Sequence, residues 1–305
     1  MIQDDVKQVV LWGHKLHSHT HSYIHAAYVK AFTHLGYRTL WLDNTDNVSN
    51  IDFAGSLFIT EGQVDNNIPK RADCYYILHN VDQGKYASIP KQNKFGLQVY
   101  TDDVIKCHNG IPIKENLLYY YASDCLFMPW GTDLLPNEID ENIRKVKNNE
   151  IETTRQVVFV GSNVEPWDKI RYFCNNNRIE YKGFASVSFE DNIKLIQESI
   201  LAPAVQNTWQ LENSYIPCRI FKNISYGKMG MTNNPTVLRM FQGKILYSSD
   251  IDTLMQMGLD FENSDPEEKK ETLIELMEYV RDNHTYIDRI NTMFWFFNNI
   301  ISKQN

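Results

Sequence analysis

Residues 7–13 of the chain read KQVVLWG, a short apolar run that ends in glycine. Such a run is typical of a strand buried in a parallel sheet. Residues 23–37, YIHAAYVKAFTHLGY, follow with apolar side chains at helical spacing, and Gly36 stands where a helix commonly ends. Residues 38–44, RTLWLDN, predict a second strand. Strand, helix and strand with short connections indicate a βαβ unit.

The same alternation continues through the first half. Four further strands are predicted, at SLFITEG (56–62), CYYILHN (74–80), FGLQVYTDD (95–103) and DCLFMPWG (124–131). Their apolar positions alternate little with polar ones, which fits a sheet covered on both faces.

A second apolar run that leads into a glycine occurs at residues 156–162, QVVFVGS, and it resembles KQVVLWG. We interpret each run as the first strand of an α/β domain. Two such starts predict two similar α/β domains in tandem. The polar segment 136–155 is the best linker candidate. We therefore expect a first domain over 1–135, a linker over 136–155, a second domain over 156–282 and a terminal helical segment over 283–305.

Cap and turn residues organise the second half. Ser188 and Asp191 form a helix-capping pattern, Pro217 opens another helix that Gly227 closes, and Ser264-Asp265-Pro266 begins a third. Short strands are predicted at 178–184, 201–207, 229–234 and 244–250, and a last helix runs from about residue 285.

Charge argues against a nucleic-acid partner. Residues 1–150 carry 14 Lys and Arg against 18 Asp and Glu, which leaves 16 against 20 of the total of 30 and 38. Each half therefore has a net charge of -4, whereas a nucleic-acid binder normally shows a positive region.

Five scattered cysteines without a C-x-x-C pair argue against disulfides and against a structural zinc site. The acidic start MIQDDVKQVV does not resemble a signal peptide, and no stretch approaches the ~20 apolar residues that span a bilayer. We expect a cytoplasmic protein with no transmembrane segment.

Residues 215–234, YIPCRIFKNISYGKMGMTNN, carry the most specific motif of the chain. The matching positions are Ile216, Pro217, Arg219, Phe221, Gly227, Thr232 and Asn233, together with a closing H-T-Y-x-x-R at His284, Thr285, Tyr286 and Arg289. This segment, with VVFVGS upstream, resembles the donor-binding domain of group-1-like GT-B glycosyltransferases of the CgeB type. The resemblance covers residues 156–292.

The resemblance implies an α/β protein of the GT-B type, with two Rossmann-like parallel-sheet domains that face a cleft. The donor, a UDP or GDP sugar, would bind the C-terminal domain, and the terminal helix would cross back to the first domain. The expected donor-binding residues are Gly161, Ser162, Tyr215, Ile216, Pro217, Arg219, Lys222, Thr232 and Asn233.

Physical chemistry supports the donor site independently. The start of a helix offers free N–H groups and a positive dipole end, which favours a diphosphate near Pro217. Arg219 can pair with phosphate through two hydrogen bonds, or form an ordinary surface ion pair instead. Gly161 and Ser162 follow the opening strand, where ligands of open α/β sheets bind.

Lys222 departs from the family pattern, which usually has Glu at this position. Lysine cannot accept hydrogen bonds from ribose hydroxyls. Either Lys222 contacts phosphate or the ribose is held differently. Ser214 replaces the acidic residue of many retaining enzymes, and the absence of this pair favours an inverting mechanism.

Five of the nine histidines lie in HKLHSHTHSYIH, residues 14–25. An inverting transfer needs a base for the acceptor hydroxyl, and the pKa of histidine suits that task. His17, His19 and His21 are the candidates, because His25 falls on the predicted helix. The sequence does not choose among them.

A rival hypothesis rests on the same histidines. L-H-S-H-T-H after a first strand also resembles the H-x-H of metal-dependent hydrolases, including the PHP phosphoesterases. Histidines two residues apart can share a divalent metal. That family requires further ligands at later strand ends, and the motif at 215–234 has no place in it. A polar, solvated loop is the third alternative.

Further acceptor-side candidates follow the other strands. Glu61 ends one strand, and His79 and Asp82 follow the next, where they would orient an acceptor, assist a base or simply form a turn. Trp130 would stack on a sugar or pack at the domain junction. The sequence thus predicts transfer of a hexose or deoxyhexose to a glycan or other hydroxyl, with no metal and no cofactor besides the sugar nucleotide.

Overall fold

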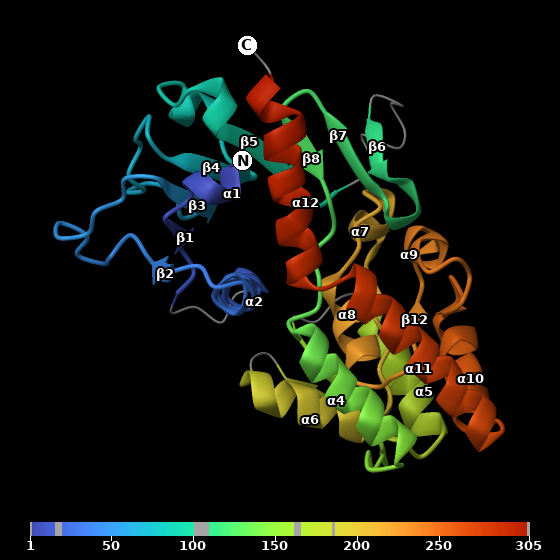
Figure 1. The fold of residues 1–305 in the computed structure, drawn as a ribbon. Helices are drawn as coiled ribbons and strands as arrows, with labels where there is room; N and C mark the ends of the chain where they lie inside the picture. Colours follow the sequence, from blue (N-terminus) through green and yellow to red (C-terminus); the bar gives the residue numbers. More distant parts are fainter. Residues whose placement is uncertain (1, 16–19, 101–109, 162–165, 185–186, 304–305) are drawn as a thin grey trace. The chain divides into compact units, whose positions relative to one another are not determined.

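The computed structural model describes residues 2–15, 20–100, 110–161, 166–184 and 187–303 (Figure 1). The chain forms two compact units, which are described separately. Unit 1 contains Met1–Pro129 and Tyr286–Asn305, and unit 2 contains Trp130–Thr285. Both units are of the α/β class, and most strand pairs are parallel, as predicted. None of the described helices is long and apolar enough to cross a membrane.

Unit 1 is built on an eight-stranded sheet in the order β2-β1-β3-β4-β5-β8-β7-β6. Its strands are β1 (Gln8–Trp12), β2 (Thr39–Leu42), β3 (Ser56–Glu61), β4 (Tyr75–His79), β5 (Lys94–Gln98), β6 (Ile111–Lys114), β7 (Tyr119–Ala122) and β8 (Cys125–Phe127). The first six in the spatial order are parallel, which confirms the predicted strands. Every residue of β1 and β3 is buried, because these strands lie inside the sheet.

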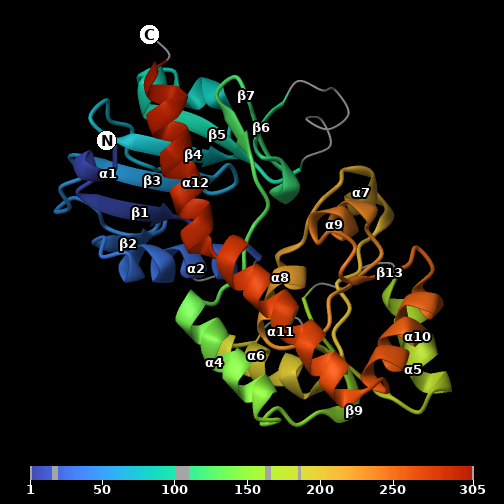
Figure 2. The ribbon, with the colours of Figure 1, turned by 45° about the vertical axis from the view of Figure 1, so that its right-hand side comes forward.

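Two helices cover one face of this sheet, α2 (Thr20–His34) and α12 (Tyr286–Asn299) (Figure 2). Phe95 of β5 meets Phe296 and Phe297 of α12 at ring-centroid distances of 5.0 and 4.6 Å. The opposite face packs on long connections and short helices around Phe58 and Tyr76. The short elements of this unit are α1 (Ile2–Asp5), η1 (Gln83–Tyr86), η2 (Lys91–Asn93), η3 (Glu115–Leu117) and η4 (Ile301–Lys303).

The antiparallel pair β6 and β7 has no counterpart in the sequence prediction. β6 pairs with β7, and β7 pairs antiparallel with β8, which adds a hairpin to the edge of the parallel sheet. Leu118 adopts a left-handed conformation (φ 56°) before β7. Neither glycine nor proline marks that turn, so the usual sequence signal was absent.

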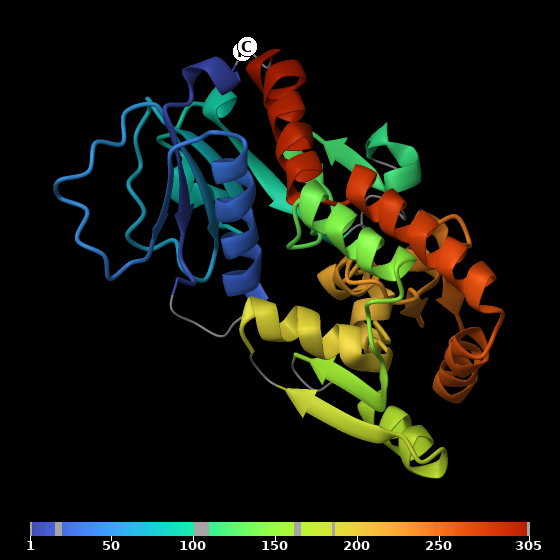
Figure 3. The ribbon, with the colours of Figure 1, turned by 60° about the horizontal axis from the view of Figure 1, so that its bottom comes forward.

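Unit 2 contains two small parallel sheets, β10-β9-β11 and β12-β13. Its strands are β9 (Thr154–Val160), β10 (Glu180–Phe184), β11 (Ser199–Leu201), β12 (Met231–Thr232) and β13 (Leu246–Tyr247). Its helices are α4 (Pro136–Lys147), α5 (Trp167–Asn176), α6 (Phe189–Glu198), α7 (Thr208–Glu212), α8 (Cys218–Ser225), α9 (Pro235–Met240), α10 (Ile251–Glu262) and α11 (Pro266–Asn283). The sheet of β9 packs on α5, α6 and α10 (Figure 3).

Residues 136–155, predicted as a linker, instead begin with helix α4. Ile139, Ile143 and Val146 are buried at helical spacing, and α4 packs along α11 (Figures 2 and 3). The polar residues of α4 lie on the opposite face, which explains why this segment has a polar composition. The boundary between the units falls earlier, after Pro129.

Candidate functional site

The first candidate site lies at the carboxyl edge of the unit 1 sheet. β1 lies between β2 and β3, and the chain leaves β1 for β2 on one side before it returns to β3 on the other. Such a reversal opens a crevice at the carboxyl ends of the two strands, where ligands of α/β sheets bind. His14 follows β1, Glu61 ends β3 and His79 ends β4.

The side chains at this edge form a compact cluster. His14 Nε2 lies 3.1 Å from Glu61 Oε2. The His21 ring stacks on the His14 ring, with centroids 5.2 Å apart, and lies 5.2 Å from the His79 ring. His25 Nδ1 lies 2.9 Å from the Gly13 carbonyl oxygen, so that nitrogen carries the proton.

Backbone geometry explains why the cluster forms after β1. Gly13 has φ 97°, and a Cβ there would lie 2.0 Å from Val64 Cγ2. His14 is itself left-handed, with φ 58°. Only glycine fits position 13, because both the conformation and the space exclude a side chain. The tight turn directs His14 toward Glu61.

Burial controls the charges in the cluster. It lowers the pKa of His25 to about 4 and the pKa of His79 to about 3, so both rings are neutral at pH 7. Burial alone would raise the pKa of Glu61. The hydrogen bonds from His14 and from the Gln63 N–H outweigh it and keep that pKa below its usual value. The cluster thus combines an ionised carboxylate with two imidazoles, His25 and His79, that resist protonation, so neither of these two is suited to act as a base at pH 7.

The same atoms have the composition of a metal site. One nitrogen each of His14 and His21 and an oxygen of Glu61 lie within 4.8 Å of one another. Imidazole and carboxylate are ligands for zinc and for other first-row metals.

The structure brings together only some of the predicted acceptor-side residues. His21, Glu61 and His79 meet in the cluster, while His17 and His19 lie outside the described residues. Asp82 is exposed and accepts a hydrogen bond from the Gly84 N–H, so it caps η1. In unit 2, Trp130 is only 4% exposed, which favours packing over sugar stacking. The role of His14 was not predicted, although its position directly after the Gly13 turn signals it.

The second candidate site lies at the carboxyl end of β9 in unit 2. β9 is the central strand of its sheet, between β10 and β11, so the chain reverses here as it does at β1. Gly161 follows β9, and the side chain of Arg219 reaches it from α8. Arg219 Nη2 donates a hydrogen bond to the Val160 carbonyl oxygen at 3.3 Å, and its guanidinium lies 4.1 Å from the Phe159 ring centroid.

The guanidinium of Arg219 is positioned by the Val160 carbonyl and the Phe159 ring. Among the described residues, no Asp or Glu lies within ion-pair distance of it. Burial lowers the pKa of Arg219, yet arginine keeps its charge at pH 7. A half-buried guanidinium with no carboxylate partner among the described residues has hydrogen-bond donors that suit an anion such as phosphate. Ser162, predicted beside it, lies outside the described residues.

The segment before α8 is held by amide side chains. Ile216 and Pro217 are buried, and Pro217 occupies the N-cap position of α8. The Tyr215 carbonyl accepts a hydrogen bond from Asn234 Nδ2 at 2.9 Å. Asn233 exchanges two hydrogen bonds with the backbone of Gln206.

Thr232 is fully buried, and its hydroxyl accepts a hydrogen bond from the Asn234 N–H. Thr232 and Asn233 therefore fix the loops around the start of α8.

Lys222, one turn beyond Arg219, is paired within the protein. Its Nζ lies 3.1 Å from Asp133 Oδ2, and the Tyr226 hydroxyl donates to the same carboxylate at 2.6 Å. Burial, followed by the Asp133 charge, raises the pKa of Tyr226 well above its usual value. Lys222 thus pairs with Asp133, whereas the sequence suggested that it contacts phosphate. No sequence signal pointed to Asp133 as its partner.

The closing H-T-Y-x-x-R motif is buried and serves packing. In unit 2, the His284 ring stacks on the Phe221 ring, with centroids 4.5 Å apart. The backbone carbonyl of His284 accepts a hydrogen bond from the Thr132 N–H at 2.9 Å. In unit 1, Arg289 is fully buried and donates to the Pro129 carbonyl at 2.7 Å and to the Tyr119 hydroxyl.

Two solved structures share the fold of this chain. One is described as an alpha-glucosyltransferase in complex with UDP, with a TM-score of 0.60, 7% identity and coverage of 95% of this chain and 99% of that chain. The other is an alpha-glucosyltransferase in complex with UDP and a 13-mer DNA containing a HMU base, with a TM-score of 0.58, 8% identity and coverage of 96% and 100%. The likeness supports the GT-B type of fold expected from the sequence, whereas the CgeB resemblance stays a prediction. No protein-family model and no curated protein matches the sequence.

Proposed function

We propose that this chain is a glycosyltransferase that moves a sugar from a nucleoside-diphosphate sugar to a hydroxyl acceptor. In this proposal unit 2 binds the donor and unit 1 binds the acceptor. The observation that carries it is the position of Arg219, a cation at the carboxyl end of β9 without a carboxylate partner among the described residues. A fold shared over nearly the whole chain with two UDP-bound structures supports the same assignment.

The donor is held by its diphosphate. Arg219 and the N–H groups at the start of α8 face the phosphates, while Gly161 lets the backbone approach them closely. These groups offset the negative charge that develops on the leaving nucleotide, so the proposal requires no metal and no further cofactor. We favour UDP over GDP, since both similar structures contain UDP.

The remaining donor-side residues have supporting roles in this scheme. Tyr215, Ile216 and Pro217 set the backbone that leads into α8, and Thr232 and Asn233 fix its neighbouring loop. Lys222 acts on phosphate only if its pair with Asp133 opens.

The acceptor is activated by the histidine cluster. The half-buried His21 takes the hydroxyl proton as the acceptor oxygen attacks the anomeric carbon, and the bond from that carbon to the diphosphate breaks. The adjacent Glu61 carboxylate stabilises the imidazolium that forms. This scheme inverts the anomeric centre, and it requires the two units to face one another across a cleft, as the GT-B type implies.

We favour a glycan or another sugar hydroxyl as the acceptor, with a hexose or deoxyhexose as the transferred group. One similar structure contains DNA. The net charge of -8 in this chain is spread evenly over both halves, whereas a duplex-binding domain normally carries a net positive charge.

Calorimetry with UDP in the presence of EDTA tests the donor site. Arg219→Ala should weaken the affinity at least tenfold, about 1.4 kcal/mol. Arg155→Ala is the matched control, because Arg155 is exposed at the opposite end of β9. Equal affinities of the wild type and Arg219→Ala would remove Arg219 from the site.

A second candidate function is metal-dependent phosphoester hydrolysis. The closeness of His14, His21 and Glu61 favours it. Under this alternative, a chelator abolishes activity and a divalent metal restores it, whereas the transferase tolerates the chelator. Incubation with UDP-glucose and a panel of sugar acceptors, with and without EDTA, separates the two functions.

A further inference from the structure

A pocket of unit 2 lies beyond the end of α8 that is opposite to Arg219. It measures about 210 Å³ and is bounded by the end of α4, the following segment, the loop after α8, and helices α10 and α11. α8 has eight residues and is therefore about 12 Å long, so this pocket is separate from the end of α8 that faces Gly161.

The backbone after α8 places one side chain in this pocket. The Gly227 N–H bonds the Ile224 carbonyl, and the Lys228 N–H bonds the Asn223 carbonyl at 3.0 Å, which is the Schellman ending of a helix. Gly227 is left-handed (φ 94°), and a Cβ there would lie 3.1 Å from both Val146 Cγ2 and Ile151 Cδ1. The position of Lys228 is thus fixed by the chain.

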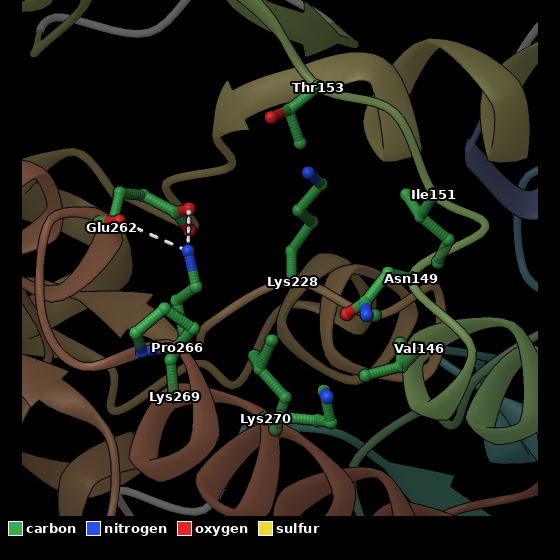
Figure 4. Close-up of a pocket in the computed structure, with 11 residues that line it drawn as sticks. Val146, Asn149, Ile151, Thr153, Lys228, Glu262, Pro266, Lys269 and Lys270 are labelled. Atoms are coloured by element: carbon green, nitrogen blue, oxygen red, sulfur yellow. Dashed lines mark hydrogen bonds and ion pairs between the residues drawn. The ribbon is translucent and has the colours of Figure 1, made fainter.

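Lys228 is a buried cation without an ion-pair partner among the described residues. Its side chain is only 4% exposed and extends into the open centre of the pocket (Figure 4). Its ammonium makes no hydrogen bond or ion pair with any residue in the described part of the chain. A charge in such surroundings is costly unless something pairs with it.

The single carboxylate that lines the pocket does not pair with Lys228. Glu262 pairs with Lys269 instead. Lys269 Nζ lies 3.2 Å from Glu262 Oε2 and donates a hydrogen bond to the Glu262 carbonyl oxygen at 3.0 Å. Lys270 also lines the pocket, and its partner Glu267 is 75% exposed, so that pair is weak. Three ammonium groups against one carboxylate leave the lining with an excess of positive charge.

The rest of the lining is suited to an organic molecule. Val146, Ile151 and Leu273 supply apolar surface, while Asn149 and Thr153 supply hydrogen-bonding groups. The free N–H groups of α11 contribute little, because the Asp265 side chain already caps Glu267 and Glu268. The lysines therefore determine the charge that this pocket accepts.

We propose that this pocket binds a small organic anion, a phosphate monoester or a carboxylate with an apolar body, through Lys228 and Lys270. The anionic group pairs with the two ammonium groups, and the apolar body lies against Val146 and Leu273. This site is independent of the donor site.

The pH dependence of binding follows from the groups around Lys228. They are Glu262 on α10 and Lys269 and Lys270 on α11, and α4 with its following segment adds no titratable group to the lining. Burial lowers the pKa of Lys228 to about 8. Affinity for the anion should therefore fall as the pH rises through 8, where the ammonium loses its proton.

Calorimetry on the full chain with phenyl phosphate and with benzoate tests the proposal and separates the two anion classes. We expect one of them to bind, and Lys228→Met to weaken that binding at least tenfold. The matched control is Lys244→Met, since Lys244 is exposed and pairs with Glu275 elsewhere in unit 2. The proposal is overturned if neither anion binds the wild type, or if Lys228→Met binds as the wild type does.

Further measurements separate lost anion binding from unfolding and from a defect of the donor site. Lys228→Met should melt no lower than the wild type, which excludes unfolding as the cause of lost binding. Its affinity for UDP should be unchanged, so failure of the proposed donor site is distinguishable from failure of this one. Labelling by pyridoxal phosphate and borohydride should occur at Lys228 and be blocked by the bound anion. Equal labelling of exposed lysines would contradict the site.

Discussion

Arg219 Nη2 lies 2.7 Å from the point where a Cβ at position 161 would stand. Gly161 also has φ 137°, a conformation that side chains rarely adopt. The glycine therefore serves two purposes at once: it allows the turn after β9 and leaves room for the guanidinium.

Gly161→Ala should weaken UDP binding by about tenfold, because the methyl group displaces Arg219. Calorimetry measures the affinity. Gly243→Ala is the matched control: Gly243 has φ 80°, but a Cβ at that position would have no atom within 4 Å, so the change adds strain without a clash. Similar losses in both variants would mean that strain, and not the position of Arg219, is responsible.

His21→Gln and Glu61→Gln should each lower kcat by about 10²-fold or more, since each removes a member of the proton-accepting cluster. UDP affinity should not change, because both residues belong to unit 1. His34→Gln tests specificity, as His34 is exposed at the end of the same helix, α2.

The products of turnover decide the stereochemistry. With UDP-α-glucose as the donor, an NMR spectrum should show a β-linked product. An α-linked product, or full activity of His21→Gln, would rule out the proposed base.

Lys228→Met should stabilise the protein by about 1–3 kcal/mol at pH 7, since it removes a buried charge. Burial lowers the pKa of Lys228 from 10.5 to about 8, so the unfolded chain binds more protons between these two values. The free energy of unfolding of the wild type therefore rises with pH from 8 to 10.5, and the advantage of the variant shrinks over the same interval. Urea titrations at pH 7 and pH 10 provide the measurement. A destabilised variant would show that Lys228 is already well compensated.

Arg289→Met should destabilise the protein by about 2–4 kcal/mol, because it removes a buried guanidinium and the hydrogen bonds that it makes. The Pro129 carbonyl loses its donor, while the Tyr119 hydroxyl and the Asp288 carboxylate each lose one partner but stay bonded to each other. Arg281→Met is the control, as Arg281 pairs with exposed carboxylates and should matter by less than about 1 kcal/mol. The measurement is the urea concentration at which half of each variant is unfolded, and equal values for the two variants would contradict the prediction.

The sequence predicted the core strands because their signal is local. The similar segments KQVVLWG and QVVFVGS form β1 and β9. At each of these strands the chain crosses from one side of the strand to the other as the sheet is built. Apolar runs that end in glycine are readable without knowledge of distant contacts. Helix α4, within the segment 136–155, was not predicted because its few apolar residues are spread through a charged segment.

The candidate sites were less predictable, because side-chain partners come from distant parts of the chain. His14 meets Glu61 across 47 positions, and Lys222 meets Asp133 across 89. Arg219 was expected from its motif, but the absence of a nearby carboxylate among the described residues became visible only in three dimensions. Lys228 carried no sequence signal, since its burial depends on α4 and α11 packing around it.

The division of the chain has a consequence for truncated forms. Unit 2 is one continuous stretch, Trp130–Thr285, whereas unit 1 is completed by α12 from the far end of the sequence. A product that stops at Pro129 would leave Phe95 and the neighbouring face of the sheet open to water, since Phe296 and Phe297 normally cover them. Premature termination anywhere before the last twenty residues should therefore yield an aggregating first unit, and joining residue 129 directly to residue 286 is the logical way to obtain that unit by itself.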